Sequence, residues 1–146
     1  MIKSIRHTGI VVTNLNKAID FYSALGFEVK SKSIEEGEFI DQVTGLNGVK
    51  LEWVKLNAAD DNLIELLYYH SHPQIKDIIF QESNQLGCSH IAFGVDNILT
   101  TCEMIEKMGG NVVNKPSLSL DGKALVAYCH DLEGVLLEIV EVIDES

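Results

Sequence analysis

Two histidines and two glutamates recur at matching places in the two halves of the chain. His7 opens the apolar stretch HTGIVV, and His90, 83 residues later, opens the similar stretch HIAFGV. Glu65 lies within LIELLYY, and Glu138, 73 residues later, lies within VLLEIVE. Imidazole nitrogens and carboxylate oxygens bind divalent metals, and both groups also move protons. The repetition therefore points to chemistry that uses all four side chains.

The alternation of side chains along a strand places each glutamate on a largely apolar face of its strand. Burying an ionised carboxylate among apolar side chains is unfavourable unless a partner neutralises it. A divalent cation held by two carboxylates and two imidazoles would do so, with two coordination positions left for water or substrate, and Ni, Co, Zn, Mn, Fe and Mg are all compatible with that set. The predicted ligands of this one metal ion are His7, Glu65, His90 and Glu138.

Each of these residues also has a plain structural interpretation. A single histidine at the start of a strand is more often a hydrogen-bonded residue than a metal ligand. A single glutamate in such a strand faces solvent if the register differs by one residue, or it pairs with a lysine. The joint recurrence of histidine with histidine and of glutamate with glutamate favours the metal site.

The two halves match beyond these four residues. Each begins with an apolar strand and a turn that contains asparagine and an aliphatic residue, TNL or DNI. An amphipathic helix is then predicted over residues 16–24 and 99–107, and each helix is followed by a glycine that ends it. The strands predicted after the helices include residues 48–56 and 61–69 in the first half and 122–129 and 134–142 in the second.

One such half is too small to close a hydrophobic core alone, so the halves are expected to pair. The predicted fold class is α+β, with two paired βαβββ modules forming a cupped, eight-stranded mixed sheet and helices outside. The chain is expected to be a single domain over residues 1–146. Module one would cover residues 1–70, the linker residues 71–87 with a helix after Pro73, and module two residues 88–146.

The composition excludes several classes of partner. A formal net charge of −11 disfavours nucleic acid and anionic membranes, whose binding relies on lysine and arginine. The sequence has no apolar run near 18 residues and no signal-peptide pattern at its start, so a cytoplasmic location is expected. Three cysteines at distant positions argue against a disulfide framework and a thiolate zinc site, and reduced core residues are expected at Cys88, Cys102 and Cys129.

The repeat and its residues together resemble the vicinal oxygen chelate superfamily, which contains glyoxalase I, methylmalonyl-CoA epimerase, extradiol dioxygenases, fosfomycin-resistance enzymes and bleomycin-binding proteins. The stretches that carry the resemblance are HTGIVVTNLNKAIDFYSALGFEV, NLIELLYY, SHIAFGVDNI and AYCHDLEGVLLEIVE, which together span nearly the whole chain. The resemblance implies paired βαβββ modules, the same four metal ligands and a homodimer.

Within the superfamily, the residue at position 65 discriminates between activities. By resemblance, an extradiol dioxygenase would use only His7, His90 and Glu138. Glu65 completes the four-ligand set of glyoxalase I, the epimerase carries glutamine at that position, and bleomycin-binding proteins lack the ligands. The resemblance therefore favours a glyoxalase I-like lyase or isomerase. The alternatives, in order, are a methylmalonyl-CoA-type epimerase, an iron extradiol dioxygenase and a metal-free small-molecule binding protein.

The substrate implied by the resemblance is a small molecule with two vicinal oxygens. The metal would stabilise the enediolate that forms when the carbon between them loses a proton, and Glu138 and Glu65 are the candidates to move that proton. The arginine and the asparagine through which bacterial glyoxalase I contacts glutathione correspond to Val11 and Tyr69 here. The resemblance therefore leaves open whether glutathione is used.

Three further residues are candidates for substrate binding. Lys123, just after the LDG turn, could meet a substrate carboxylate or phosphate, although a lysine in a turn is usually only solvated. Tyr69 and Trp53 could line the pocket, although both also suit a strand core.

The remaining histidines have no histidine at the matching place in the other half. They are expected at the surface or in loops, and they are His70, His72 and His130. The EEGEF run over residues 35–39 is expected to form a charged loop.

Overall fold

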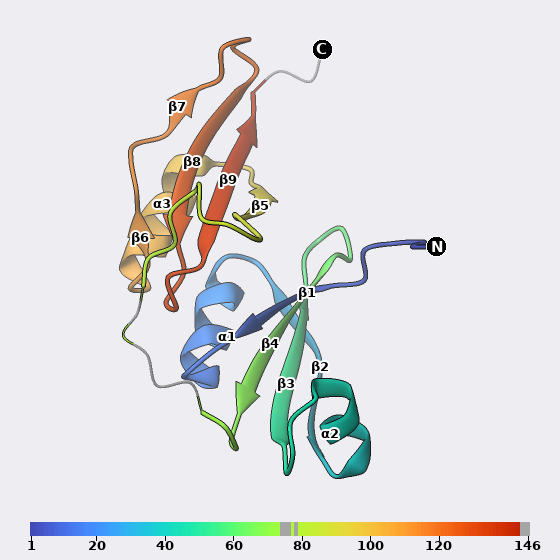
Figure 1. The fold of residues 1–146 in the computed structure, drawn as a ribbon. Coiled ribbons are helices and arrows are strands. Elements are labelled where there is room, and N and C mark those ends of the chain that lie inside the picture. The colour runs from blue at the N-terminus through green and yellow to red at the C-terminus, as the bar shows by residue number, and fades with distance from the viewer. Residues whose placement is uncertain (74–76, 78, 144–146) are drawn as a thin grey trace. The chain divides into compact units, whose positions relative to one another are not determined.

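The chain divides into two compact units, Met1–Lys76 and Asp77–Ser146. The computed structural model describes residues 1–73, 77 and 79–143. Each unit contains a mixed sheet and at least one helix that packs on it (Figure 1). The division falls within residues 71–87, the predicted linker. No helix among the described residues is long and apolar enough to cross a membrane.

The first unit forms a four-stranded sheet in the order β1-β4-β3-β2. The first and last strands of the unit pair in parallel, and the other neighbours pair antiparallel. Its elements are β1 (Thr8–Val11), α1 (Leu15–Ala24), β2 (Glu28–Glu36), α2 (Glu38–Thr44), β3 (Lys50–Asn57) and β4 (Leu63–Tyr69).

The second unit repeats this plan in the order β5-β9-β8-β6, with β7 also paired to β8. Its first and last strands are again parallel neighbours. Its elements are β5 (Ile91–Gly94), α3 (Ile98–Lys107), β6 (Asn111–Val112), β7 (Ser117–Leu118), β8 (Ala124–His130) and β9 (Leu136–Val142).

The α+β class and the repeated module are confirmed by these two sheets, but the described strands number nine rather than eight. The extra strand arises because the partner of β8 is split into β6 and β7. Pro116 lies in the interruption and has no N–H to donate to a strand ladder. The pairing of the two modules into one cupped sheet remains a prediction.

Both repeated helices begin as the asparagine-containing turns predict. The side chain of Asn14 accepts a hydrogen bond from the Lys17 N–H at 3.0 Å, and that of Asn97 accepts one from the Thr100 N–H at 2.9 Å. Asparagine at this position satisfies an N–H that the first helical turn leaves without a partner. The helices begin one residue earlier than predicted, at Leu15 and Ile98, and end where predicted.

The main helix of the first unit covers one face of its sheet and leaves the other face for polar residues. Phe21 and Tyr22 of α1 are buried, as are Ile64 and Leu66 of β4. The intervening residue of β4, Glu65, points to the opposite face, because side chains alternate along a strand. The position of α1 therefore decides which face can carry chemistry.

Two expectations about the segments between strands need correction. Residues 35–39 are not a loop: Glu35 and Glu36 end β2, Gly37 turns the chain with a φ of 101°, and Glu38 begins α2. The charged residues of this segment suggested a loop, and the helix has no apolar face to indicate it, since Ile40 is its one buried residue. The helix predicted after Pro73 falls partly on residues 74–76 and 78, which lie outside the described residues, and residues 79–87 form no helix.

The segment before β5 packs closely against the turn between β8 and β9. Gly134 in that turn has a φ of 80°, and a Cβ there would collide with the main-chain carbonyl of Ile79. Gly122, in the turn between β7 and β8, has a similar φ of 74°, but a Cβ there would have no neighbour within 4 Å. The two glycines thus share a backbone conformation and differ in packing.

We expect Gly134→Ala to destabilise the protein more than Gly122→Ala. Both alanines carry the strain of a left-handed backbone, about 1–2 kcal/mol. Only the alanine at position 134 must also displace the main chain of Ile79, which adds at least about 1 kcal/mol. Denaturant unfolding of both variants measures the difference, and equal losses would show that the contact with Ile79 does not contribute to stability.

Candidate functional site

The first unit brings His7 and Glu65 together. His7 directly precedes β1, and the parallel register places Gly9 opposite Glu65 of β4. His7 Nε2 lies 3.5 Å from Glu65 Oε2, and the Glu65 side chain is only 13% exposed. Because Gly9 has no side chain, it does not separate the imidazole from the carboxylate. The parallel pairing of β1 with β4 therefore creates the first histidine and glutamate pair.

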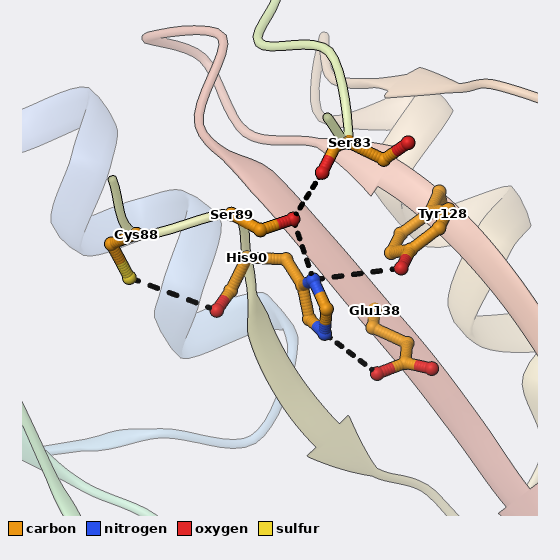
Figure 2. A network of polar contacts seen from close by, with 6 residues as sticks. All are labelled: Ser83, Cys88, Ser89, His90, Tyr128 and Glu138. Atoms are coloured by element: carbon orange, nitrogen blue, oxygen red, sulfur yellow. Dashed lines mark hydrogen bonds and ion pairs between the residues drawn. The ribbon is translucent and has the colours of Figure 1, made fainter. Parts of the chain in front are cut away.

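The second unit builds the same arrangement from His90 and Glu138. His90 directly precedes β5, and the register places the small residue Ala92 opposite Glu138 of β9. His90 Nε2 lies 3.0 Å from Glu138 Oε2, and Figure 2 shows the two side chains facing one another. Each unit thus brings one histidine and one glutamate of the four predicted ligand residues next to one another.

The meeting of the two pairs at one point remains a prediction, because they belong to different units. Among the described residues, no group of three or more histidine, cysteine, aspartate or glutamate side chains is close enough to hold a metal. Each unit therefore carries half of the predicted ligand set.

The donors in each half fit a divalent metal. Two ligands bound at right angles to an ion, each about 2.1 Å from it, are about 3.0 Å apart. His90 Nε2 and Glu138 Oε2 are 3.0 Å apart, and His7 Nε2 and Glu65 Oε2 are 3.5 Å apart. One nitrogen and one oxygen from each half would make the borderline donor set that Zn, Ni, Co, Mn and Fe accept.

The sequence prediction missed Lys55, which lies beside the first pair. Lys55 of β3 is opposite Glu65 in the antiparallel register, and its Nζ is 3.5 Å from Glu65 Oε2. The same ammonium lies 4.8 Å from the ring centroid of Trp53, whose indole N–H donates to Glu35 at 3.0 Å. The residue types alone did not show this contact, because it depends on the register of the hairpin formed by β3 and β4.

Tyr128 occupies the position in the second unit that Lys55 occupies in the first. Tyr128 of β8 is opposite Glu138, just as Lys55 of β3 is opposite Glu65. The Tyr128 hydroxyl is 3.5 Å from His90 Nδ1 and the two rings are 5.2 Å apart (Figure 2). The two carboxylates thus have different neighbours, a cation in the first unit and a neutral phenol in the second.

The three predicted substrate-binding residues lie in different surroundings. Trp53 is on the Glu65 face of the first sheet, two residues from Lys55. Tyr69 packs against an apolar cluster of Ile40, Val49 and Leu51 beside α2. Lys123 is exposed in the turn after β7, where its main-chain N–H donates to Asp121 at 3.1 Å. None of these three roles is tested by the geometry.

Two of the histidines outside the repeat, His70 and His130, have structural partners. His70 is exposed, and its Nε2 lies 2.7 Å from Glu52. His130 is 5% exposed, so its expected place at the surface is wrong. Its Nδ1 is 3.0 Å from the Asn111 amide nitrogen and its Nε2 is 2.8 Å from the Gln81 carbonyl. Because this carbonyl supplies an acceptor, the second unit can bury His130.

The two buried cysteines do not supply a nucleophile to the pairs. Cys102 and Cys129 are buried free thiols, as predicted. Burial raises the pKa of both thiols, that of Cys129 to about 12, so neither is a thiolate at neutral pH. Cys88 is exposed, which corrects its expected place in the core.

Comparison with known proteins identifies the family. The model described as the Glyoxalase/Bleomycin resistance protein/Dioxygenase superfamily matches residues 4–139. The chain is 38% identical to a lactoylglutathione lyase of Haemophilus influenzae over 138 residues, 94% of this chain and 91% of that protein. It is 29% identical to a probable lactoylglutathione lyase of Synechocystis over 137 residues, 92% of each chain.

A solved structure supports the same assignment. A glyoxalase family protein from Bacillus cereus matches with a TM-score of 0.89 and 26% identity, over 99% of this chain and 97% of that one. The likeness therefore extends over the whole of both modules. With a family model that spans nearly the full sequence, the resemblance read from the repeated histidines and glutamates is confirmed, and the chain belongs to the glyoxalase, bleomycin resistance protein and dioxygenase superfamily.

Proposed function

We propose that this protein is a divalent-metal-dependent lyase or isomerase of the glyoxalase type. It would chelate the adjacent oxygens of a small substrate and move a proton on the carbon between them. The observation that carries the proposal is the imidazole and carboxylate pair at the equivalent place in each module. The relatives named lactoylglutathione lyase support a glyoxalase-type enzyme.

The proposed metal ligands are His7, Glu65, His90 and Glu138, which would meet when the two modules pair in one chain or between the chains of a homodimer. When bound, the metal would supply Lewis-acid stabilisation of the negative charge on the substrate oxygens. Such stabilisation is worth several kcal/mol, and each 1.4 kcal/mol or so changes the rate about tenfold.

The two glutamates are the proposed groups for proton transfer, and their neighbours give them different tasks. Lys55 offers Glu65 a second cationic partner at 3.5 Å, so this carboxylate can leave one cation without losing all ionic contact. Glu138 faces the neutral Tyr128 across the strands. We therefore assign the mobile, proton-carrying role first to Glu65 and the more constant ligand role to Glu138.

The substrate would bind on the polar face of the first sheet. Trp53 supplies a flat apolar surface and Lys55 a cation next to Glu65, a combination suited to a small molecule with an anionic group. Lys123 and Tyr69 are further proposed contacts. The positions at which the resemblance places glutathione contacts hold Val11 and Tyr69, so the thiol need not be glutathione.

Metal analysis with matched variants tests the proposal. We expect natively purified or Ni-reconstituted protein to hold about one metal ion per chain, and His7→Ala or Glu65→Ala to weaken binding at least about tenfold. His70→Ala is the control, because His70 and Glu52 form an even shorter pair, 2.7 Å, that has no counterpart in the second module. Its metal content should equal that of the original protein.

The same proteins are then assayed for proton exchange in heavy water with hemithioacetals and with acyl-CoA thioesters. Exchange with the first substrate class supports the glyoxalase reaction, and exchange with the second supports the epimerase reaction. A protein that holds no metal even after reconstitution would overturn the enzymatic proposal and favour a metal-free binding protein.

The Lys55 contact also favours a second candidate function, an iron extradiol dioxygenase. In that enzyme the metal would be bound by His7, His90 and Glu138, and Glu65 would serve only as the ionic partner of Lys55. The two functions differ in whether Glu65 contacts the metal.

Removal of the lysine charge separates these functions. If Glu65 is a ligand, Lys55→Met should tighten metal binding about threefold to tenfold, since a cation a few ångströms away no longer opposes the ion. Lys50→Met is the control, because Lys50 pairs with Glu36 at 3.9 Å and not with a proposed ligand. Unchanged metal affinity in Lys55→Met, together with oxygen uptake by the iron form, would favour the dioxygenase.

A further inference from the structure

Within the second unit, the segment that leads into His90 is bound to strands β8 and β9 and to the turn between them. Gln81 makes three of these contacts. Its N–H donates to the Gly134 carbonyl at 2.9 Å, and its side-chain oxygen accepts from the Leu136 N–H at 3.1 Å. Its carbonyl lies 2.8 Å from His130 Nε2. The chain from residue 81 to His90 is therefore tied to the sheet that carries Glu138.

Two serines continue this attachment to the histidine ring. The Ser89 hydroxyl donates to the main-chain carbonyl of Ser83 at 2.7 Å. The same Ser89 oxygen lies 3.0 Å from His90 Nδ1, and Figure 2 shows it between the ring and Ser83. The Tyr128 hydroxyl is a more distant neighbour of that nitrogen, at 3.5 Å.

The hydrogen atoms in this chain of contacts can be assigned. A carbonyl oxygen only accepts, and a hydroxyl has one hydrogen to donate. Since Ser89 gives its hydrogen to Ser83, its oxygen can only accept from His90, and Nδ1 must carry the hydrogen. In the neutral ring the other nitrogen, Nε2, then has a free lone pair, and Nε2 is the atom that faces Glu138 at 3.0 Å.

A lone pair and a carboxylate oxygen repel one another unless a positive charge joins them. A metal ion bound by both would satisfy every group in the chain of contacts at once. Metal-binding histidines commonly donate their other ring N–H to a nearby acceptor, which fixes the tautomer and the orientation of the ring. The contacts around His90 have this form before any metal is considered.

We infer that Ser89 is a positioning residue, which with the Ser83 carbonyl holds His90 in the form that presents Nε2 to a divalent cation beside Glu138. This inference rests on the proposed metal site and deepens it. The hydrogen bond between Ser89 and His90 has no equivalent among the described residues of the first module. The residue before His7 is Arg6, whose guanidinium cannot accept a hydrogen bond. The segment between the modules thus takes part in the site and is not only a spacer.

Zinc binding by four full-length variants tests the inference. Ser89→Ala should weaken Zn²⁺ affinity about tenfold or more, the range found for groups that orient metal ligands. Ser89→Thr keeps the hydroxyl and should restore the affinity. Ser83→Ala is the matched control, because Ser83 contributes only its main-chain carbonyl, and it should bind zinc like the original protein. Tyr128→Phe should have a smaller effect than Ser89→Ala, given its longer contact.

A spectroscopic measurement separates orientation from general damage. In the zinc-loaded protein, nitrogen NMR of the histidine rings should show hydrogen on Nδ1 of His90 and metal at Nε2. In the metal-free original protein His90 should already carry hydrogen on Nδ1. In metal-free Ser89→Ala this preference should be lost, while the His7 ring signals stay unchanged.

The outcomes distinguish this inference from the proposed function. If the original protein binds zinc and Ser89→Ala binds it equally well with the same ring signals, the inference is wrong and the metal site stands. If Ser83→Ala is weakened as much as Ser89→Ala, the hydroxyl is not the cause and the inference is again wrong. If the original protein binds no zinc, the inference and the proposed metal site both fall.

Discussion

The parallel pairing of the first and last strands in each module is the constraint on which the candidate site depends. In such a pair, residues that are distant in the sequence lie next to one another on one face of the sheet. The register of β1 with β4 brings the residue before β1 to Glu65, and the register of β5 with β9 repeats this for His90 and Glu138. A shift of one residue in either pairing would turn the carboxylate toward the helix.

The helix on the opposite face of the sheet excludes the carboxylate from that face. The buried aromatic residues of α1 and the buried isoleucine and leucine of β4 form an apolar layer that cannot accept a carboxylate. The alternation of side chains then places Glu65 on the free face, where His7 and Lys55 reach it. The core of each module and its polar pair are thus two consequences of one strand register.

The repeat singled out the two histidines and the two glutamates, because matching spacings in two halves are improbable without a shared structural role. The partners beyond the pairs were harder to predict. Lys55 contacts Glu65 through a hairpin whose register is not visible in the residue types alone. Helix α2 is concealed because it buries one residue, Ile40, and so lacks an apolar periodicity. His130 looked like a loop residue because its partner, the carbonyl of Gln81, is a main-chain group that no sequence pattern marks.

The two modules differ in the residues next to their histidine and glutamate pairs. Both keep the histidine before the first strand and the glutamate on the last, but the residue across from the glutamate is lysine in one and tyrosine in the other. The residue before the histidine is arginine in one and serine in the other. A site that uses both pairs would therefore present a substrate with two chemically different sides. One side has the ammonium of Lys55 over Trp53, and the other has an imidazole that contacts the hydroxyl groups of Ser89 and Tyr128. Proton removal and return need only one carboxylate within reach on each side. The different neighbours would instead let each side contact a different part of one asymmetric substrate.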